Sequence, residues 1–211
     1  MGREGGDGGA MGDLIKAGCV ALVLSLSLAA PVAAGQPEDG LAADERGDYA
    51  TALRLWRPLA AQGHAASLYN FGLMYDTGQG VSQDDAKAVT WLRKAAEQSH
   101  ASAQFNLGVM YERGQGVPQD SAEAVKWFRK AAEQGDASAQ SNLGLMYDAG
   151  RGVPQDYVRA CMWFLLAAAR FPASETARRE KAVEGRDLVA EKMTAAQIAE
   201  ALRLARDWKP K

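Results

Sequence analysis

The sequence "NLGVMYERGQGVPQD", residues 106–120, indicates a repeat architecture, because near-copies of it begin at Asn70 and at Asn142. Each copy lies in a longer unit, and these units align without a gap: 65–100, 101–136 and 137–172. Of the 36 aligned positions, 21 are identical between the first two units and 20 between the second and third. A period of this length is typical of proteins that repeat one supersecondary unit.

Apolar residues recur at helical spacing twice within each unit. In the middle unit the first stripe is Ala103, Leu107, Met110 and Tyr111. Gly114 then suits a left-handed C-cap, and Pro118 disfavours a continuing helix. Asp120 can cap a second helix, with Glu123 as its capping-box partner. The second stripe is Ala124, Trp127, Phe128, Ala131 and Ala132. Each unit is therefore predicted to hold two helices, the A helix and the B helix.

Small and large residues recur at fixed places in these helices. A glycine inside a helix is about 1 kcal/mol less favourable than alanine, so a repeated one indicates a closely packed neighbouring helix. Such glycines occur in every A helix: Gly72, Gly108 and Gly144. Each B helix pairs an alanine with a tryptophan: Ala88 with Trp91, Ala124 with Trp127, and Ala160 with Trp163. We predict an all-α solenoid of stacked antiparallel helix pairs, with the tryptophans as the large core residues.

The repeated pattern "AQ.NLG.MY..G.GV.QD...A..W..KAAEQG" resembles the Sel-one-like repeat, a tetratricopeptide-like family. The likeness covers about 65–172, and residues such as Gly108, Tyr111 and Trp127 match the family motif. The resemblance implies a right-handed α/α superhelix that serves as a protein-interaction scaffold and has no chemistry shared by the family.

Both ends of the array depart from the repeat. Residues 35–64 form an atypical first unit, with a short A helix at 38–46 and a B helix at 47–64 that contains Pro58. Residues 173–211 are predicted to form two capping helices, roughly 175–191 and 195–208. Thr194 and Gln197 predict a capping box at the start of the second one. Four of its residues are expected to cover the open end of the stack: Ile198, Leu202, Ala205 and Trp208.

The N-terminal segment predicts export. The apolar run at 17–30 follows Lys16 and ends before small residues at 32 and 34, as in a cleaved signal peptide spanning 1–34. The alternative is an uncleaved membrane anchor, and either Met1 or Met11 is the start. We expect a periplasmic or secreted protein, or an inner-membrane-anchored one that faces the periplasm. The formal net charge of −2 does not favour nucleic-acid binding.

Catalytic patterns are absent from the sequence. His64 and His100 occupy equivalent turns one repeat apart, and Asp136 occupies the third. Helix N-capping explains these three residues better than a shared metal does. Cys161 stands where Val125 stands one repeat earlier, which indicates a buried small hydrophobe. We therefore expect no enzyme activity, metal or cofactor.

The asparagine that opens each copy is the main candidate for a functional residue: Asn70, Asn106 and Asn142. Its side-chain amide either forms hydrogen bonds with groups of the neighbouring helix or binds a peptide backbone on the concave face. The resemblance supports the second role, because the asparagine precedes "LG" as it does in tetratricopeptide peptide clamps. We nevertheless favour the structural role, with peptide contact as the secondary one. The slots around Asn106 hold Ser102, Phe105 and Val109 instead of basic residues, so we do not expect a ligand held there by its C-terminal carboxylate.

Further candidates are A-helix positions that differ between units. Tyr69 and Phe105 either pack in the core or form an apolar anchor for a partner. Gln104 and Gln140 are expected on the same concave face. The predicted function is binding of a protein or peptide. The alternative is a small-ligand binder or hydrolase that uses a concave pocket.

Overall fold

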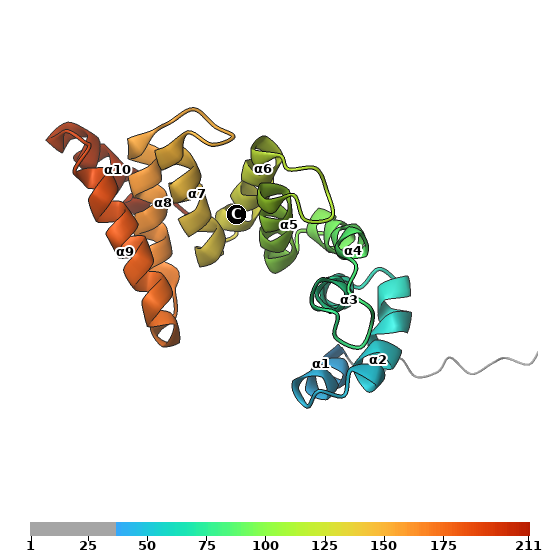
Figure 1. Cartoon of the computed structure of the whole chain (residues 1–211). Helices are drawn as coiled ribbons and strands as arrows, with labels where there is room; N and C mark the ends of the chain where they lie inside the picture. The colour runs from blue at the N-terminus through green and yellow to red at the C-terminus, as the bar shows by residue number, and fades with distance from the viewer. Residues whose placement is uncertain (1–36) are drawn as a thin grey trace, which may run out of the picture. The chain divides into compact units, whose positions relative to one another are not determined.

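The computed structural model describes residues 37–211, in which all regular structure is helical (Figure 1). The predicted signal peptide at 1–34 lies outside the described residues. The helices are α1 (Pro37–Glu45), α2 (Tyr49–Ala61), α3 (Ala65–Thr77), α4 (Asp85–Glu97), α5 (Ala101–Arg113), α6 (Ser121–Glu133), α7 (Ala137–Ala149), α8 (Tyr157–Arg170), α9 (Thr176–Ala190) and α10 (Ala195–Asp207). A short 3-10 turn at Ala173–Glu175 precedes α9. Within 37–211, no helix has the length and apolarity needed to cross a membrane.

Consecutive helices pack on each other from α1 to α9, and the tightest pairs are the predicted A and B helices of each unit. The A helices α3, α5 and α7 begin one period apart, at Ala65, Ala101 and Ala137. This arrangement confirms the predicted right-handed α/α solenoid of antiparallel pairs. Each helix adds its apolar stripe to a core shared with the next, since neither helix can bury that stripe alone.

Side-chain caps determine where the helices begin and end. The A helices are capped by His64, His100 and Asp136, whose side chains accept hydrogen bonds from Ser67, Ala103 and Ala139 N–H groups. Aspartates cap the B helices: Asp84, Asp120 and Asp156. Glycines in the left-handed conformation end the A helices: Gly78, Gly114 and Gly150. These caps confirm the N-capping interpretation of the histidines. Glu123, which was predicted to complete a capping box with Asp120, instead forms an ion pair with Lys126 at 2.8 Å.

The glycine inside each A helix marks its closest approach to the B helix. A Cβ on Gly108 would lie 2.6 Å from Cδ1 of Phe128, and one on Gly144 would lie 2.8 Å from Cδ1 of Phe164. In the first unit the corresponding atom is Cγ of Leu92, 2.6 Å from a Cβ on Gly72. The prediction that no methyl group fits here is confirmed. In each unit the B-helix residue that the glycine contacts lies four positions after the repeated alanine of that helix, as Phe128 does after Ala124.

Two of the three repeated tryptophans, Trp127 and Trp163, are buried as predicted. Trp91 is only half-buried, with its ring 5.4 Å from that of Phe71 and Lys94 Nζ above it. In the atypical first unit Trp56 is buried instead, and its indole N–H donates to the carbonyl of Pro37. The large core residue therefore shifts along the B helix at the N-terminal end of the array.

The C-terminal helices differ in part from the prediction. The capping box between Thr194 and Gln197 is present, but Leu202 is 51% exposed instead of covering the stack. The buried side of α10 carries Ala201 and Leu204, beside Ala205 and Trp208, and it packs on α8. The helix that follows α8 in the stack is α9, where Gly185 approaches Phe164 as closely as Gly144 does. Both stripes of α10 have helical spacing, so the choice depends on the surface of α8.

Candidate surface on the A helices

The repeated asparagines occupy one register of α3, α5 and α7. Each is half-buried and is followed by a buried residue and then by the closely packed glycine, as Asn106 is followed by Leu107 and Gly108. The backbone at this place is therefore held in position by the core. The side chain lies at the edge of the buried stripe, where it is accessible to a partner.

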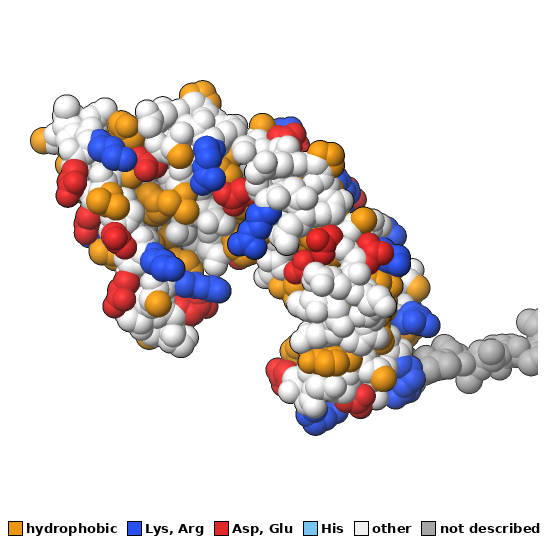
Figure 2. Space-filling view, viewed as in Figure 1, with side chains coloured by type: hydrophobic (Ala, Val, Ile, Leu, Met, Phe, Trp, Pro, Cys, Tyr) orange, Lys and Arg blue, Asp and Glu red, His pale blue; other side chains and the backbone are white. Residues whose placement is uncertain are grey.

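An aliphatic residue follows each closely packed glycine and lies on the same side of its helix as the asparagine, one turn away. These residues are Leu73, Val109 and Leu145; in α1, Leu41 likewise follows Gly40, but Glu38 takes the place of the asparagine. Leu41 and Leu145 are each 46% exposed, which is unusual for large hydrophobic side chains. Figure 2 shows hydrophobic side chains among charged ones near α7 and α9 and again near α1 and α3. We call the three asparagine–aliphatic pairs of α3, α5 and α7 the A-helix surface.

The three asparagines differ in their hydrogen bonds. The amide of Asn106 is bonded to the hydroxyl of Tyr69 from the preceding A helix. Phe105 takes the place of Tyr69 one repeat later and has no hydroxyl to offer Asn142. Within residues 37–211, the side-chain amides of Asn70 and Asn142 have no hydrogen-bond partner. The same repeated residue is thus satisfied by the fold in one unit and free to bind a partner in two.

Tyr69 and Phe105 are half-buried, and the ring of each packs against a ring that lies later in the chain. The Tyr69 ring stacks on His100 with centroids 4.7 Å apart, and the Phe105 ring lies 5.9 Å from that of Phe128. Burial raises the pKa of the Tyr69 hydroxyl, while its bond with Asn106 lowers the pKa and the Asp136 carboxylate raises it further. Both aromatic residues therefore support the core and keep one edge accessible.

Gln104 and Gln140 do not lie on the accessible face, where the sequence placed them. Both are buried, and their amides donate to the carbonyls of Ala96 and Ala132 at 3.0 and 3.1 Å. Gln134 in turn donates to Oε1 of Gln104 at 2.8 Å. These glutamines join each A helix to the end of the preceding B helix, so their amides are not available to a partner.

The acidic residues near the ends of the A helices are paired between units. Arg151 lies 3.3 Å from Glu112 of the preceding unit, and Lys192 lies 2.8 Å from Asp148. Such exposed pairs contribute little to stability, but they leave the amides of Asn70 and Asn142 as the polar groups of the A-helix surface that have no partner within residues 37–211.

The other groups considered in the sequence have structural positions. Cys161 is buried, and burial raises the pKa of its thiol, which disfavours the reactive thiolate. Burial likewise lowers the pKa of His100. Among residues 37–211, no cluster of three or more histidine, cysteine, aspartate or glutamate side chains has the arrangement of a metal site.

Comparison with known proteins now places this architecture. The family model described as Sel1 repeat matches residues 38–64, 65–100, 101–136 and 137–170. The chain belongs to the Sel1 repeat family. The first match, 38–64, agrees with the atypical unit predicted upstream, and Sel1 repeat arrays in general mediate protein interactions.

Two solved structures are similar to this Sel1 repeat protein. One is a Sel1 repeat protein from Oxalobacter formigenes, with 32% identity and a TM-score of 0.63, covering 81% of this chain and 74% of that one. The other is c5321, a protective antigen present in uropathogenic Escherichia coli strains, with 32% identity and a TM-score of 0.55. That match covers 76% of this chain and 41% of the antigen. No curated protein matches the chain.

Sequence reasoning missed the aliphatic residues of the A-helix surface, although a signal for them was present. The residue after each closely packed glycine is always aliphatic, yet it falls outside the stripe formed by Leu107 and Met110. An apolar residue kept outside the buried stripe in every unit indicates a second contact.

Proposed function

We propose that this Sel1 repeat protein is an exported scaffold that binds a protein partner through an extended peptide segment on the concave face of the solenoid. The amides of Asn70 and Asn142 hydrogen-bond the peptide main chain, and Leu73 and Leu145 contact its apolar side chains. The observation that carries this proposal is the pair of half-buried amides without a partner, each one helical turn from an aliphatic residue. A polar group in such a place is stabilised when a ligand supplies its hydrogen bonds.

The partner's chemistry follows from the charges of this surface. Of the three acidic residues at the ends of these helices, Glu112 and Asp148 are paired with Arg151 and Lys192, and burial raises the pKa of the third, Asp76. The surface therefore offers amides and aliphatic groups, which favour an uncharged stretch of peptide with alternating apolar side chains. Residence in the periplasm follows from the predicted signal peptide at 1–34 and forms part of the same proposal.

A photo-crosslinking experiment tests the proposal. The photoreactive residue p-benzoylphenylalanine replaces Leu145 on the A-helix surface or, as a matched control, Leu188, which is 52% exposed on α9. In the native cell envelope we expect one adduct of defined mass at position 145 and none at 188. Adding Asn142→Ala to the first variant should abolish that adduct. Equal labelling at both positions, or an adduct that survives Asn142→Ala, would overturn the proposal.

A further inference from the structure

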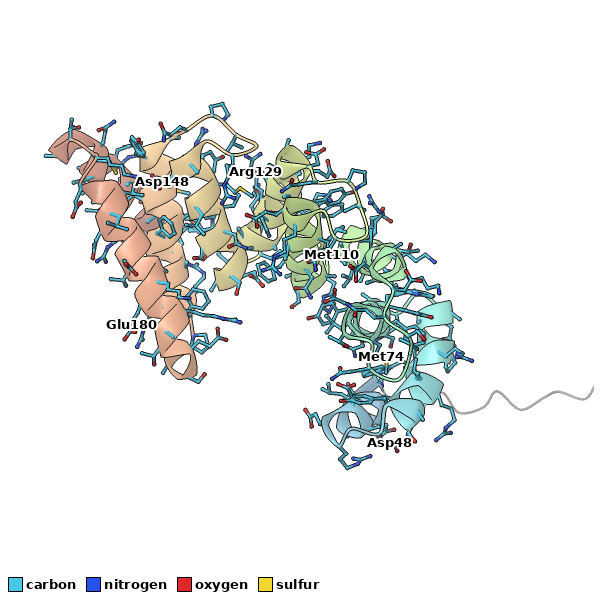
Figure 3. All side chains as sticks on the ribbon, in the orientation of Figure 1. Asp48, Met74, Met110, Arg129, Asp148 and Glu180 are labelled. Atoms are coloured by element: carbon cyan, nitrogen blue, oxygen red, sulfur yellow. The ribbon has the colours of Figure 1, made fainter. Side chains whose placement is uncertain are left out.

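A recess lies on the B-helix side of the last unit, where α10 packs on α8. It has a volume of about 560 Å³, within the range of small-molecule sites. Its apolar wall is made by Met162, Trp163 and Leu204. The rest of the lining is Tyr147 and four charged residues: Arg129, Glu133, Arg159 and Glu200. The recess shares no residue with the A-helix surface. Figure 3 labels Arg129 near the place where α6 and α7 approach each other.

The third unit is built differently from the others at this place. Met162 and Leu166 replace Lys126 and Lys130 of the second unit, where Lys130 Nζ lies 4.2 Å from the centroid of the Trp127 ring. The apolar replacements let α10 pack on α8, and they remove the lysine that would otherwise cover Trp163. A smaller recess of about 290 Å³ lies at the equivalent place of the second unit, where Lys126 and Lys130 form part of its lining. The larger volume and the apolar wall are therefore features of the terminal unit.

The charges around the recess are not balanced. Its two carboxylates are already paired, Glu200 with Arg203 at 2.7 Å and Glu133 with Lys211 at 3.0 Å. By contrast, within 37–211 the guanidinium of Arg129 has a single contact, donating from Nη2 to the hydroxyl of Tyr147 at 3.0 Å. Its remaining N–H groups are free to donate. The second arginine of the wall, Arg159, lies with its guanidinium carbon 5.7 Å from the centroid of the same tyrosine ring.

We propose that this recess binds an organic carboxylate that carries an apolar or aromatic body. The free donors of Arg129 form a planar fork that matches the two oxygens of a carboxylate. The body lies against Trp163, Met162 and Leu204, which exclude water from the ion pair and strengthen it. The ligand is either a small free acid or the last residue of a peptide, since both present the same group.

Calorimetry with N-acetyl-L-phenylalanine tests the proposal on the full chain. We expect N-acetyl-L-phenylalaninamide, which lacks the charge, to bind at least about tenfold more weakly. Arg129→Gln should weaken binding of the acid by a similar factor. Arg93→Gln is the matched control, because Arg93 makes the equivalent hydrogen bond to the hydroxyl of Tyr111 one repeat earlier. Circular dichroism verifies that both variants are folded.

The outcomes separate clearly. Binding of the acid that is lost in Arg129→Gln and kept in Arg93→Gln supports the site. Tighter binding of a hexapeptide ending in phenylalanine then identifies the last residue of a partner as the source, and weaker binding identifies a small acid. Absence of binding at millimolar concentration, equal binding of acid and amide, or equal loss in the two arginine variants would overturn the proposal.

Discussion

Replacing Gly108 by alanine measures how closely the helix pairs interlock. The new Cβ would lie 2.6 and 2.7 Å from Cδ1 and Cε1 of Phe128, whereas apolar carbons in contact are normally about 3.5–4.0 Å apart. Phe128 is fully buried, so its rigid ring has to move by about 1 Å within a close-packed core. Overpacking of this kind costs about 1–3 kcal/mol, and alanine contributes about 1 kcal/mol of helix propensity in return.

We therefore expect Gly108→Ala to lower the free energy of unfolding by about 1 kcal/mol, and by no more than about 2 kcal/mol. Urea denaturation followed by circular dichroism should show a lower midpoint with an unchanged slope. Gly144→Ala serves as a replicate, because its Cβ would lie 2.8 Å from Cδ1 of the Phe164 ring. An unchanged or higher midpoint in both variants would show that helix propensity outweighs the contact, and would refute the interlocking of the A and B helices.

Two further perturbations have matched controls. Burial raises the pKa of Asp136 above its ordinary value of 3.8, so the native state loses stability as the pH rises from about 4. Asp136→Asn should therefore stabilise the protein more, relative to wild type, at pH 7 than at pH 3. Asp84→Asn is the matched control, because the hydrogen bond from Lys87 N–H lowers the pKa of Asp84. This variant should be destabilising at neutral pH and less so in acid. If urea curves show that the change from pH 7 to pH 3 shifts the relative stability of both variants in the same direction, the reasoning is wrong. Gln140→Leu should be about 1 kcal/mol less destabilising than Gln104→Leu, because Oε1 of Gln140 has no partner within 37–211; equal thermal midpoints would count against this difference.

The helices and their caps could be predicted because their signals are local and repeated. Aspartate before each B helix and glycine after each A helix act within one turn, so neighbouring units do not alter them. The closely packed glycines were predictable for a similar reason. Glycine is unfavourable inside a helix, and its recurrence in three units, at Gly72, Gly108 and Gly144, therefore indicates that the same close contact recurs.

The positions of Gln104 and Gln140 could not be predicted from polarity alone. A glutamine reaches the carbonyls at the end of the preceding B helix, so it can be buried without losing its hydrogen bonds. Leu68 at the same register of the first unit was the available indication of burial. Likewise, the hydroxyl of Tyr69 decides that Asn106 is satisfied, and this contact depends on a helix 37 residues away in sequence.

The buried side of α10 and the recess beside it were also beyond local patterns. Leu202 and Leu204 lie on alternative stripes of equal helical character, and only the surface of α8 selects between them. The change from Lys126 and Lys130 to Met162 and Leu166 was the one sequence feature that could have indicated this contact.

An NMR titration shows whether the A-helix surface binds a peptide through its free amides. The peptide comes from the region of the partner crosslinked at position 145, and the observed signals are side-chain NH₂ groups. We predict large shifts for Asn70 and Asn142 and unchanged signals for Gln104 and Gln140, whose amides are buried. Shifts of the glutamine signals, with the two asparagines unaffected, would contradict the claim.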